Sequence, residues 1–81
     1  MDRDAVRTKL QDILRDVVDD DSVVITDEAV AGDIAHWDST NHVRLIVALE
    51  QELHIHFETD EITAPKSVGA LIELIQAKLT G

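Results

Sequence analysis

Apolar residues recur at helical spacing along most of the chain. Near the N-terminus they follow one another at intervals of four, three, one and three residues, at Val6, Leu10, Ile13, Leu14 and Val17. This spacing is typical of one face of an amphipathic helix. Asp2 or Asp4 can cap its start, and the acidic run 19–21 disfavours continuation because acids repel a helix C-terminus. The pattern predicts a helix over residues 3–18.

The following segment, 19–38, is long for a connection, and such loops are usually functional or locally packed. It carries six apolar side chains that can anchor it: Val23, Val24, Ile25, Val30, Ile34 and Trp37. Residues 23–25 have no second strand to pair with. We therefore expect an ordered loop, with a short helical turn near 27–30 and a bend at Gly32.

Two further helices are expected in the second half. One spans residues 39–53, with Asp38 or Ser39 as N-cap and a buried stripe of Val43, Ile46, Ala48, Leu49 and Leu53, broadened by Leu45 and Val47. A short acidic segment with one helical turn near 60–63 follows. The last helix spans 67–79, with Ser67 as N-cap, Thr80–Gly81 at its end, and Val68, Leu71, Ile72, Ile75 and Leu79 as its stripe. These stripes predict an all-α fold, a small three-to-four-helix bundle with a long loop between the first two helices, in one domain over 1–81.

Charge and composition narrow the functional classes. The 81 residues contain 17 acids, 7 bases and no cysteine, for a formal net charge of −10. That charge argues against nucleic acid and anionic membranes, and favours a basic protein partner. Without cysteine the chain has no disulfide, thiolate nucleophile or cysteine-based zinc site. The acidic start without an apolar stretch predicts no signal peptide and a cytoplasmic protein.

Among the serines, Ser39 stands out. Ser22 lies in an acidic run and is expected to be a solvent-exposed loop residue, and Ser67 is expected to cap a helix. Ser39 lies in Trp37-Asp38-Ser39-Thr40, where an ordered loop meets a helix whose other face is buried. The free N–H groups of a helix N-terminus suit a phosphate ester on this hydroxyl. From the residues alone, capping of the helix by Ser39 remains the favoured interpretation.

The stretch 34–53 resembles the core of acyl carrier proteins. In that family an Asp-Ser-Leu motif opens the second helix, which ends in Leu-Glu-x-Glu and a bulky apolar residue. The matching positions here are Asp38, Ser39, Val43, Leu45, Ala48, Leu49, Glu50, Glu52 and Leu53. The order of elements, the length, the acidity and the absence of cysteine agree over the whole chain.

The resemblance implies a carrier rather than an enzyme. Ser39 would be esterified with 4′-phosphopantetheine, donated by coenzyme A through a phosphopantetheinyl transferase that recognises Asp38. The thiol of this arm would hold acyl groups as thioesters and present them to acyl-loading, condensing or modifying enzymes at high effective concentration. A monomer is expected, and no metal.

The expected partner surface is the outward face of the second helix and the acidic segment after it: Thr40, Arg44, Val47, Glu50, Gln51, Glu58, Asp60 and Glu61. Contacts there should be weak and salt-sensitive. Thr40 departs from the leucine that the family places after the serine, which puts transferase preference in doubt. Arg44 interrupts the acidity and could discriminate among partners.

The histidines and the tryptophan have structural and functional interpretations. His54 and His56, with Glu52 and Glu58 nearby, suggest a zinc site, but solvated histidines are the favoured interpretation. His36 and His42 flank Ser39, and a surface role near the arm is favoured for both. Trp37 is expected to pack the loop onto the bundle.

The pathway is less determined than the carrier role. The Trp-Asp-Ser start and the segment 42–46 resemble discrete carriers of polyketide or related secondary-metabolite pathways. Carriers of fatty acid or aminoacyl and peptidyl intermediates remain alternatives. From other classes, the alternatives are an unmodified acidic helical interaction module and a small hydrolase that uses Ser39 and His42.

Overall fold

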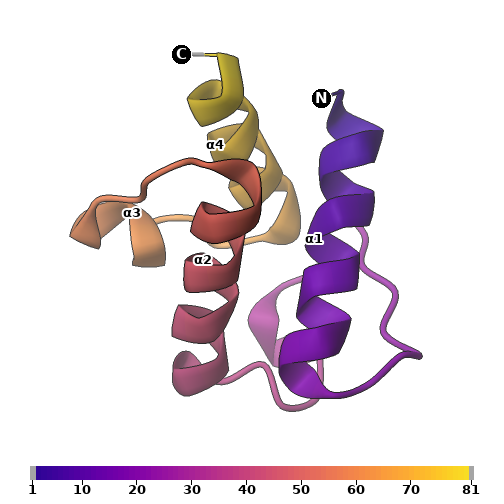
Figure 1. Cartoon of the computed structure of the whole chain (residues 1–81). Helices are drawn as coiled ribbons and strands as arrows, with labels where there is room; N and C mark the ends of the chain where they lie inside the picture. Colours follow the sequence, from indigo (N-terminus) through magenta and orange to yellow (C-terminus); the bar gives the residue numbers. More distant parts are fainter. Residues whose placement is uncertain (1, 81) are drawn as a thin grey trace.

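The computed structural model describes residues 2–80, without the side chain of Thr80. The described chain consists of helices and loops, with α1 at Arg3–Val18, a 3-10 turn η1 at Ala31–Asp33, α2 at Ser39–Leu53, α3 at Thr59–Thr63 and α4 at Val68–Thr80. Helix α1 packs against both α2 and α4, and it runs opposite to α2, while the short α3 lies on the far side of α2 (Figure 1). The expected all-α bundle is confirmed. Gly81, which the sequence placed after the last helix, lies outside the described residues.

Helix α1 has the predicted bounds. Asp2 is its N-cap, and its carboxylate accepts a hydrogen bond from the Ala5 N–H at 2.8 Å. The predicted stripe is buried except at Val17, which is half-buried. The next residue, Val18, takes the buried position instead and is 5% exposed. The helix ends at Val18, and the next residue, Asp19, has a left-handed φ of 56° that turns the chain away.

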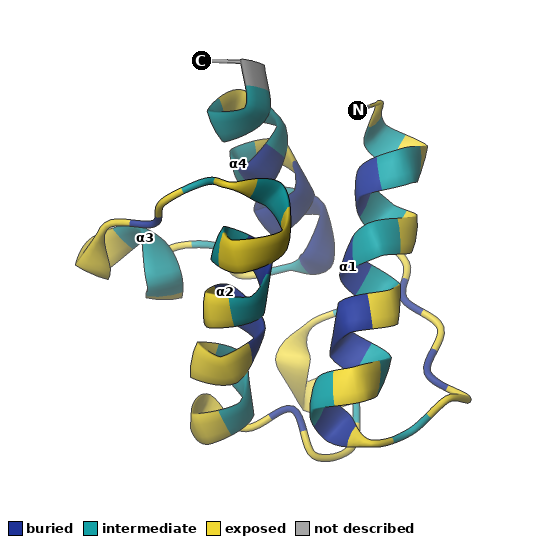
Figure 2. Ribbon diagram, in the orientation of Figure 1, coloured by how far each residue is buried: buried dark blue, intermediate teal, exposed yellow. Residues whose placement is uncertain are grey.

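The core is mostly aliphatic and lies between α1, α2 and α4 (Figure 2). Its members are Val6, Leu10, Ile13, Leu14, Val18, Val23, Ile25, Trp37, Leu45, Ile46, Leu49, Phe57, Val68, Leu71, Ile72 and Ile75. Val43 was expected in it, but 52% of this side chain is exposed. Val47, expected to broaden the buried stripe, is 45% exposed. Val43 and Val47 lie one turn apart on a face of α2 that α1 and α4 leave uncovered, so both of these burial predictions were wrong.

The long loop is ordered, as expected, but only part of the predicted anchoring is correct. Val23, Ile25 and Trp37 are buried, whereas Val24 and Val30 are 69% and 39% exposed. The short helical turn comes at 31–33, later than the predicted 27–30. Alternate side chains of an extended segment face opposite ways, which explains why Val24 turns outward between two buried neighbours.

A polar side chain also fixes this loop. The Asp27 carboxylate accepts hydrogen bonds from Arg3 at 2.8 Å and from Arg7 at 2.9 Å, both on α1. These two guanidinium groups hold the pKa of Asp27 below its ordinary value. The backbone carbonyl of Asp27 accepts from the Gly69 N–H at 2.9 Å, which joins the loop to the start of α4. Asp27 therefore ties α1, the loop and α4 together.

The second half follows the prediction closely. Helix α2 has the expected bounds, α3 begins one residue earlier than expected, and α4 one residue later. Ser67 Oγ accepts from the Ala70 N–H at 3.2 Å, which confirms Ser67 as the cap of α4. Lys78 of α4 donates to Glu61 of α3 at 2.7 Å and lies 5.3 Å from the centre of the Phe57 ring. Within residues 2–80, no helix combines the length and apolar character needed to cross a membrane.

Candidate functional site

Ser39 is the first residue of α2, and it is exposed. Its neighbour Asp38 is the N-cap, and the Asp38 carboxylate accepts a hydrogen bond from the Asn41 N–H at 2.9 Å. The expectation that Ser39 itself caps the helix was therefore wrong. Because Asp38 satisfies the cap, the Ser39 hydroxyl has no hydrogen-bond partner among the described residues.

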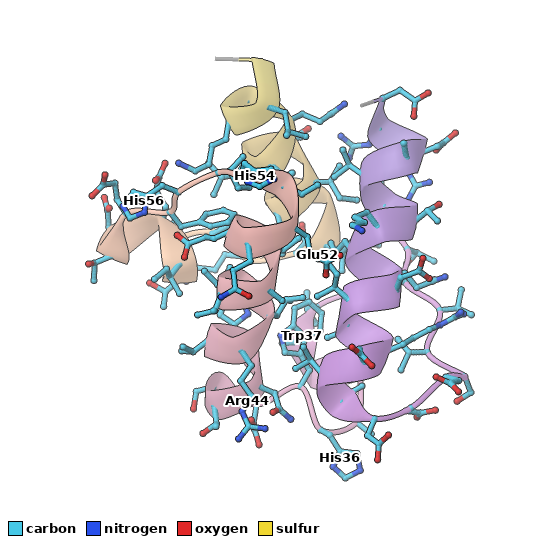
Figure 3. The ribbon with its side chains drawn as sticks, in the orientation of Figure 1. His36, Trp37, Arg44, Glu52, His54 and His56 are labelled. Carbon is cyan, nitrogen blue, oxygen red and sulfur yellow. The ribbon has the colours of Figure 1, made fainter. Side chains whose placement is uncertain are left out.

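The loop before Ser39 is held in one conformation. The Asn41 side-chain amide donates to the His36 carbonyl at 2.7 Å, and His36 adopts a left-handed φ of 67°. Trp37 is only 8% exposed and points between α1 and α2 (Figure 3). Its expected role in packing the loop onto the bundle is confirmed. These contacts fix the segment that leads into α2 at Ser39.

His42 differs from the expected surface role. The Trp37 indole Nε1–H donates to His42 Nδ1 at 3.1 Å, and His42 Nε2 lies 2.7 Å from the carbonyl oxygen of Ile62. Since Nδ1 accepts, Nε2 carries the proton and donates to the carbonyl. Both ring nitrogens are used inside the fold, so His42 is not placed as a base for Ser39. The hydrolase interpretation loses its second residue.

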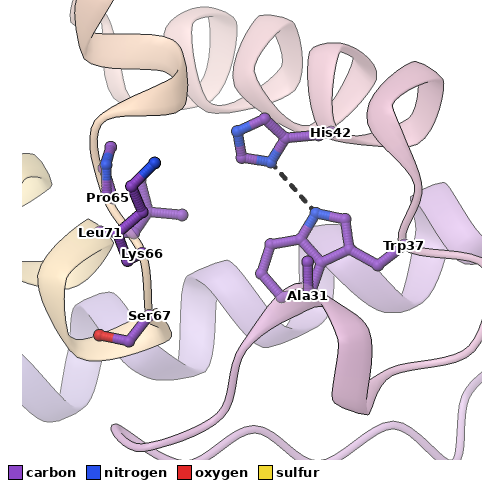
Figure 4. Close-up of a pocket in the computed structure, with 7 residues that line it drawn as sticks. All are labelled: Ala31, Trp37, His42, Pro65, Lys66, Ser67 and Leu71. Carbon is purple, nitrogen blue, oxygen red and sulfur yellow. Dashed lines mark hydrogen bonds between the residues drawn. The ribbon is translucent and has the colours of Figure 1, made fainter.

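A groove runs from Ser39 between α2 and the segment after α3. It has a volume of about 410 Å³, and its walls include Val30, Ala31, Gly32, Thr63, Pro65 and Lys66 as well as Ser39 and His42. A small cavity of about 60 Å³ shares several of these walls and is also lined by the buried side chains of Trp37 and Leu71 (Figure 4). Lys66 contributes a positive side chain to the same groove.

The residues expected to form the partner surface divide into two groups. Thr40, Arg44, Val47 and Gln51 are exposed on α2, and Arg44 points outward near the start of that helix (Figure 3). Glu58 and Asp60 are exposed at α3.

Two acids of the expected surface are engaged within the fold. Glu50 accepts from the Phe57 N–H at 2.8 Å. Glu61 binds Lys78 and accepts from the Glu58 N–H at 2.8 Å, and these contacts lower its pKa. Less of these two carboxylates is available to a partner than the sequence suggested.

The other histidines are not gathered around a metal. His54 follows α2 with a left-handed φ of 55°. The exposed His56 lies 3.3 Å from Glu50 and 3.7 Å from Glu58, while Glu52 turns toward α1 and pairs with Lys9 at 2.7 Å. Over residues 2–80, no group of three ligand-type side chains is placed to hold a metal.

Comparisons with known proteins fit this geometry. No family model and no curated protein matches the chain. A solved structure does: the holo acyl carrier protein of Geobacter metallireducens, determined by NMR in solution, is 44% identical with a TM-score of 0.85, over 93% of this chain and 86% of that one. The chain belongs to the acyl carrier protein family. It is therefore a carrier protein and not an enzyme, as the resemblance implied.

Two residues at the site were not found by sequence reasoning. Lys66 directly follows Pro65, before α4, and belongs to no recognisable sequence motif. His42 was recognised as a neighbour of Ser39 but not as a partner of Trp37. The only available signal for the Trp37–His42 hydrogen bond was the five-residue spacing between them. This spacing becomes informative only when Trp37 is known to be the residue just before the helix cap.

Proposed function

We propose that this acyl carrier protein holds acyl groups as thioesters on a 4′-phosphopantetheine arm esterified to Ser39 Oγ. The proposal is supported above all by the Ser39 hydroxyl, which is exposed at the first position of α2 and does not cap the helix. Cysteine is absent from the chain, so a thioester needs a thiol from outside, and the arm supplies it.

The residues around Ser39 fit a phosphate ester. The N-terminus of α2 offers unpaired backbone N–H groups and positive potential, which stabilise a phosphate at this position. Lys66 adds a positive side chain along the same groove. On attachment, the Ser39 oxygen forms the new P–O bond while the pyrophosphate bond of coenzyme A breaks. Adenosine 3′,5′-bisphosphate leaves, and the hydroxyl proton passes to a base of the transferase.

The exposed face of α2 is the surface that we propose for partner enzymes. Val43 and Val47 are 52% and 45% exposed, with Thr40, Arg44 and Gln51 beside them, and Glu58 and Asp60 add negative charge from α3. A small apolar patch within an acidic field suits a basic partner that binds weakly and releases quickly. We further propose that the carrier works in the cytoplasm as a monomer in a polyketide or related pathway, with fatty acid synthesis as the alternative.

Attachment of the arm is tested by intact mass. Incubation of the apo-protein with coenzyme A and a broad-specificity transferase should add one phosphopantetheine, and Ser39→Ala should abolish the gain. Ser22→Ala is the matched control, because Ser22 is an exposed loop serine hydrogen-bonded to Asp20, and it should be modified like the unaltered protein. No gain in the unaltered protein would favour the unmodified interaction module instead.

Thr40 supplies a second test. It is exposed directly after Ser39, so Thr40→Leu adds apolar area where the transferase must approach. We expect faster modification by a generalist transferase, measured as the mass gain over time. Equal or slower conversion would show that this position does not limit recognition.

A further inference from the structure

The route from Ser39 toward the core passes His42. The groove that begins at Ser39 and the small cavity behind it share His42 as a wall, together with Ala31, Pro65 and Lys66. Only the cavity reaches the buried side chains of Trp37 and Leu71. A group that enters from the groove must therefore fit inside this cavity or displace its walls.

A bridge of three residues keeps these walls together. Trp37 donates to His42, and His42 donates to the carbonyl of Ile62 on α3, while the Trp37 and His42 rings stack with centroids 6.0 Å apart. The bridge joins the entry of α2, its first turn and α3. Widening the cavity means breaking it, which leaves the indole N–H of a residue that is 8% exposed without an acceptor. An unsatisfied buried donor is costly.

The cavity is small compared with known ligand cavities. An apolar cavity of about 150 Å³ accepts benzene, with its six carbons. By the same scale, the cavity of about 60 Å³ behind His42 holds roughly two or three carbons, so an acyl group of up to about four carbons fits when its thioester carbonyl carbon stays outside. Other core side chains, Leu45, Leu49, Ile72 and Ile75, are at most 2% exposed and do not line this cavity.

We propose that the Trp37–His42–Ile62 bridge restricts the acyl groups that the core can hold to short ones, of up to about four carbons, by closing the core to longer chains. His42 is then a specificity-determining residue. The proposal rests on the proposed function, because it needs an arm on Ser39. Longer chains remain in the open groove or in solvent, where a partner enzyme has to shelter them.

The test is a chain-length series that starts from the apo-protein. The transferase installs acetyl, butyryl, octanoyl and dodecanoyl arms on Ser39 from the corresponding acyl-coenzyme A, and each product is verified by intact mass. Thermal midpoints and the NMR resonance of the Trp37 indole N–H, the single tryptophan of the chain, are then compared. We expect acetyl and butyryl arms to shift the indole resonance, and octanoyl and dodecanoyl arms to give no midpoint above that of the butyryl form.

Two substitutions sharpen the test. His42→Ala removes the bridge and enlarges the cavity, so octanoyl and dodecanoyl arms should now raise the midpoint above that of the butyryl form. His42→Gln keeps a side chain that can accept from Trp37 and donate to Ile62, and it should behave like the unaltered protein. If His42→Ala does not fold, the unaltered protein and His42→Gln decide the matter.

The outcomes separate the two proposals. A midpoint that rises steadily from butyryl to dodecanoyl in the unaltered protein, with a shifted indole resonance, overturns the length restriction and leaves the carrier role intact. A folded His42→Ala that gains nothing from long arms overturns the role of His42. Failure to add any arm, seen at the mass step, removes the proposed function and this inference with it.

Discussion

Replacing Trp37 with alanine removes the side chain that joins the long loop to α2. Trp37 is 8% exposed, belongs to the core and donates one hydrogen bond to His42. Truncation of a buried tryptophan costs about 3–5 kcal/mol of unfolding free energy through lost contacts and the cavity that remains. The whole stability of an 81-residue domain is roughly 4–12 kcal/mol. Trp37→Ala should therefore remove a quarter or more of it.

The expected shift in thermal midpoint follows from the size of the chain. A domain of this length loses roughly 4–8 °C per kcal/mol, so Trp37→Ala should lower the midpoint by at least about 12 °C. Trp37→Phe keeps a buried ring but loses the donor to His42, and about 1–2 kcal/mol is expected for it. Because the alanine variant has no tryptophan emission, the assay is circular dichroism at 222 nm during heating and during urea unfolding.

Val24→Ala is the control for the same loop. Val24 is 69% exposed, so its truncation should change the unfolding free energy by no more than about 0.5 kcal/mol. A Trp37→Ala midpoint within about 3 °C of the unaltered protein would refute the packing role, and so would an equal loss in Val24→Ala. If acyl transfer fell while stability stayed, Trp37 would instead be a contact of the arm or of a partner.

Three other predictions concern stability. Asp27 has a folded-state pKa below its unfolded value, so the stabilisation that it provides is present above roughly pH 4 and is lost as the pH falls. The difference in thermal midpoint between the unaltered protein and Asp27→Asn should therefore be largest near pH 7 and disappear in strong acid. A difference that does not depend on pH would contradict this. A Cβ on Gly69 would lie 3.0 Å from the Asp27 carbonyl oxygen, so Gly69→Ala should lower the thermal midpoint. Gly32 has open space around it, so Gly32→Ala should raise the unfolding free energy by about 0.4–1 kcal/mol. The reverse order of the two variants in heating scans would contradict the packing argument. His54→Gly relieves a left-handed φ of 55° after α2 and should add up to about 1 kcal/mol in urea unfolding, and a loss would show that the His54 side chain stabilises this turn.

Local rules were enough for the helices but not for the faces they present. The bounds of α1 and α2 followed from periodicity and capping residues, because those signals lie within a few positions of one another. The burial of Val43 could not be obtained this way, since it depends on where α1 and α4 lie against α2. The cap was ambiguous for a related reason: Asp38 and Ser39 are both good N-caps, and a register of one residue decides between them.

The ambiguity at the cap is also where structure and function meet. If Ser39 capped α2, its hydroxyl would be bound to the helix and unavailable for esterification. Because Asp38 takes that role, the aspartate stabilises the helix, and the next residue is left exposed at the positive end of the helix dipole. Three residues further on, His42 turns inward to Trp37 and Ile62, while Val43 beside it turns outward. One turn of α2 thus provides the attachment hydroxyl, the wall of the cavity and the start of the partner surface, so a substitution at any of these positions should change one function and leave the other two measurable.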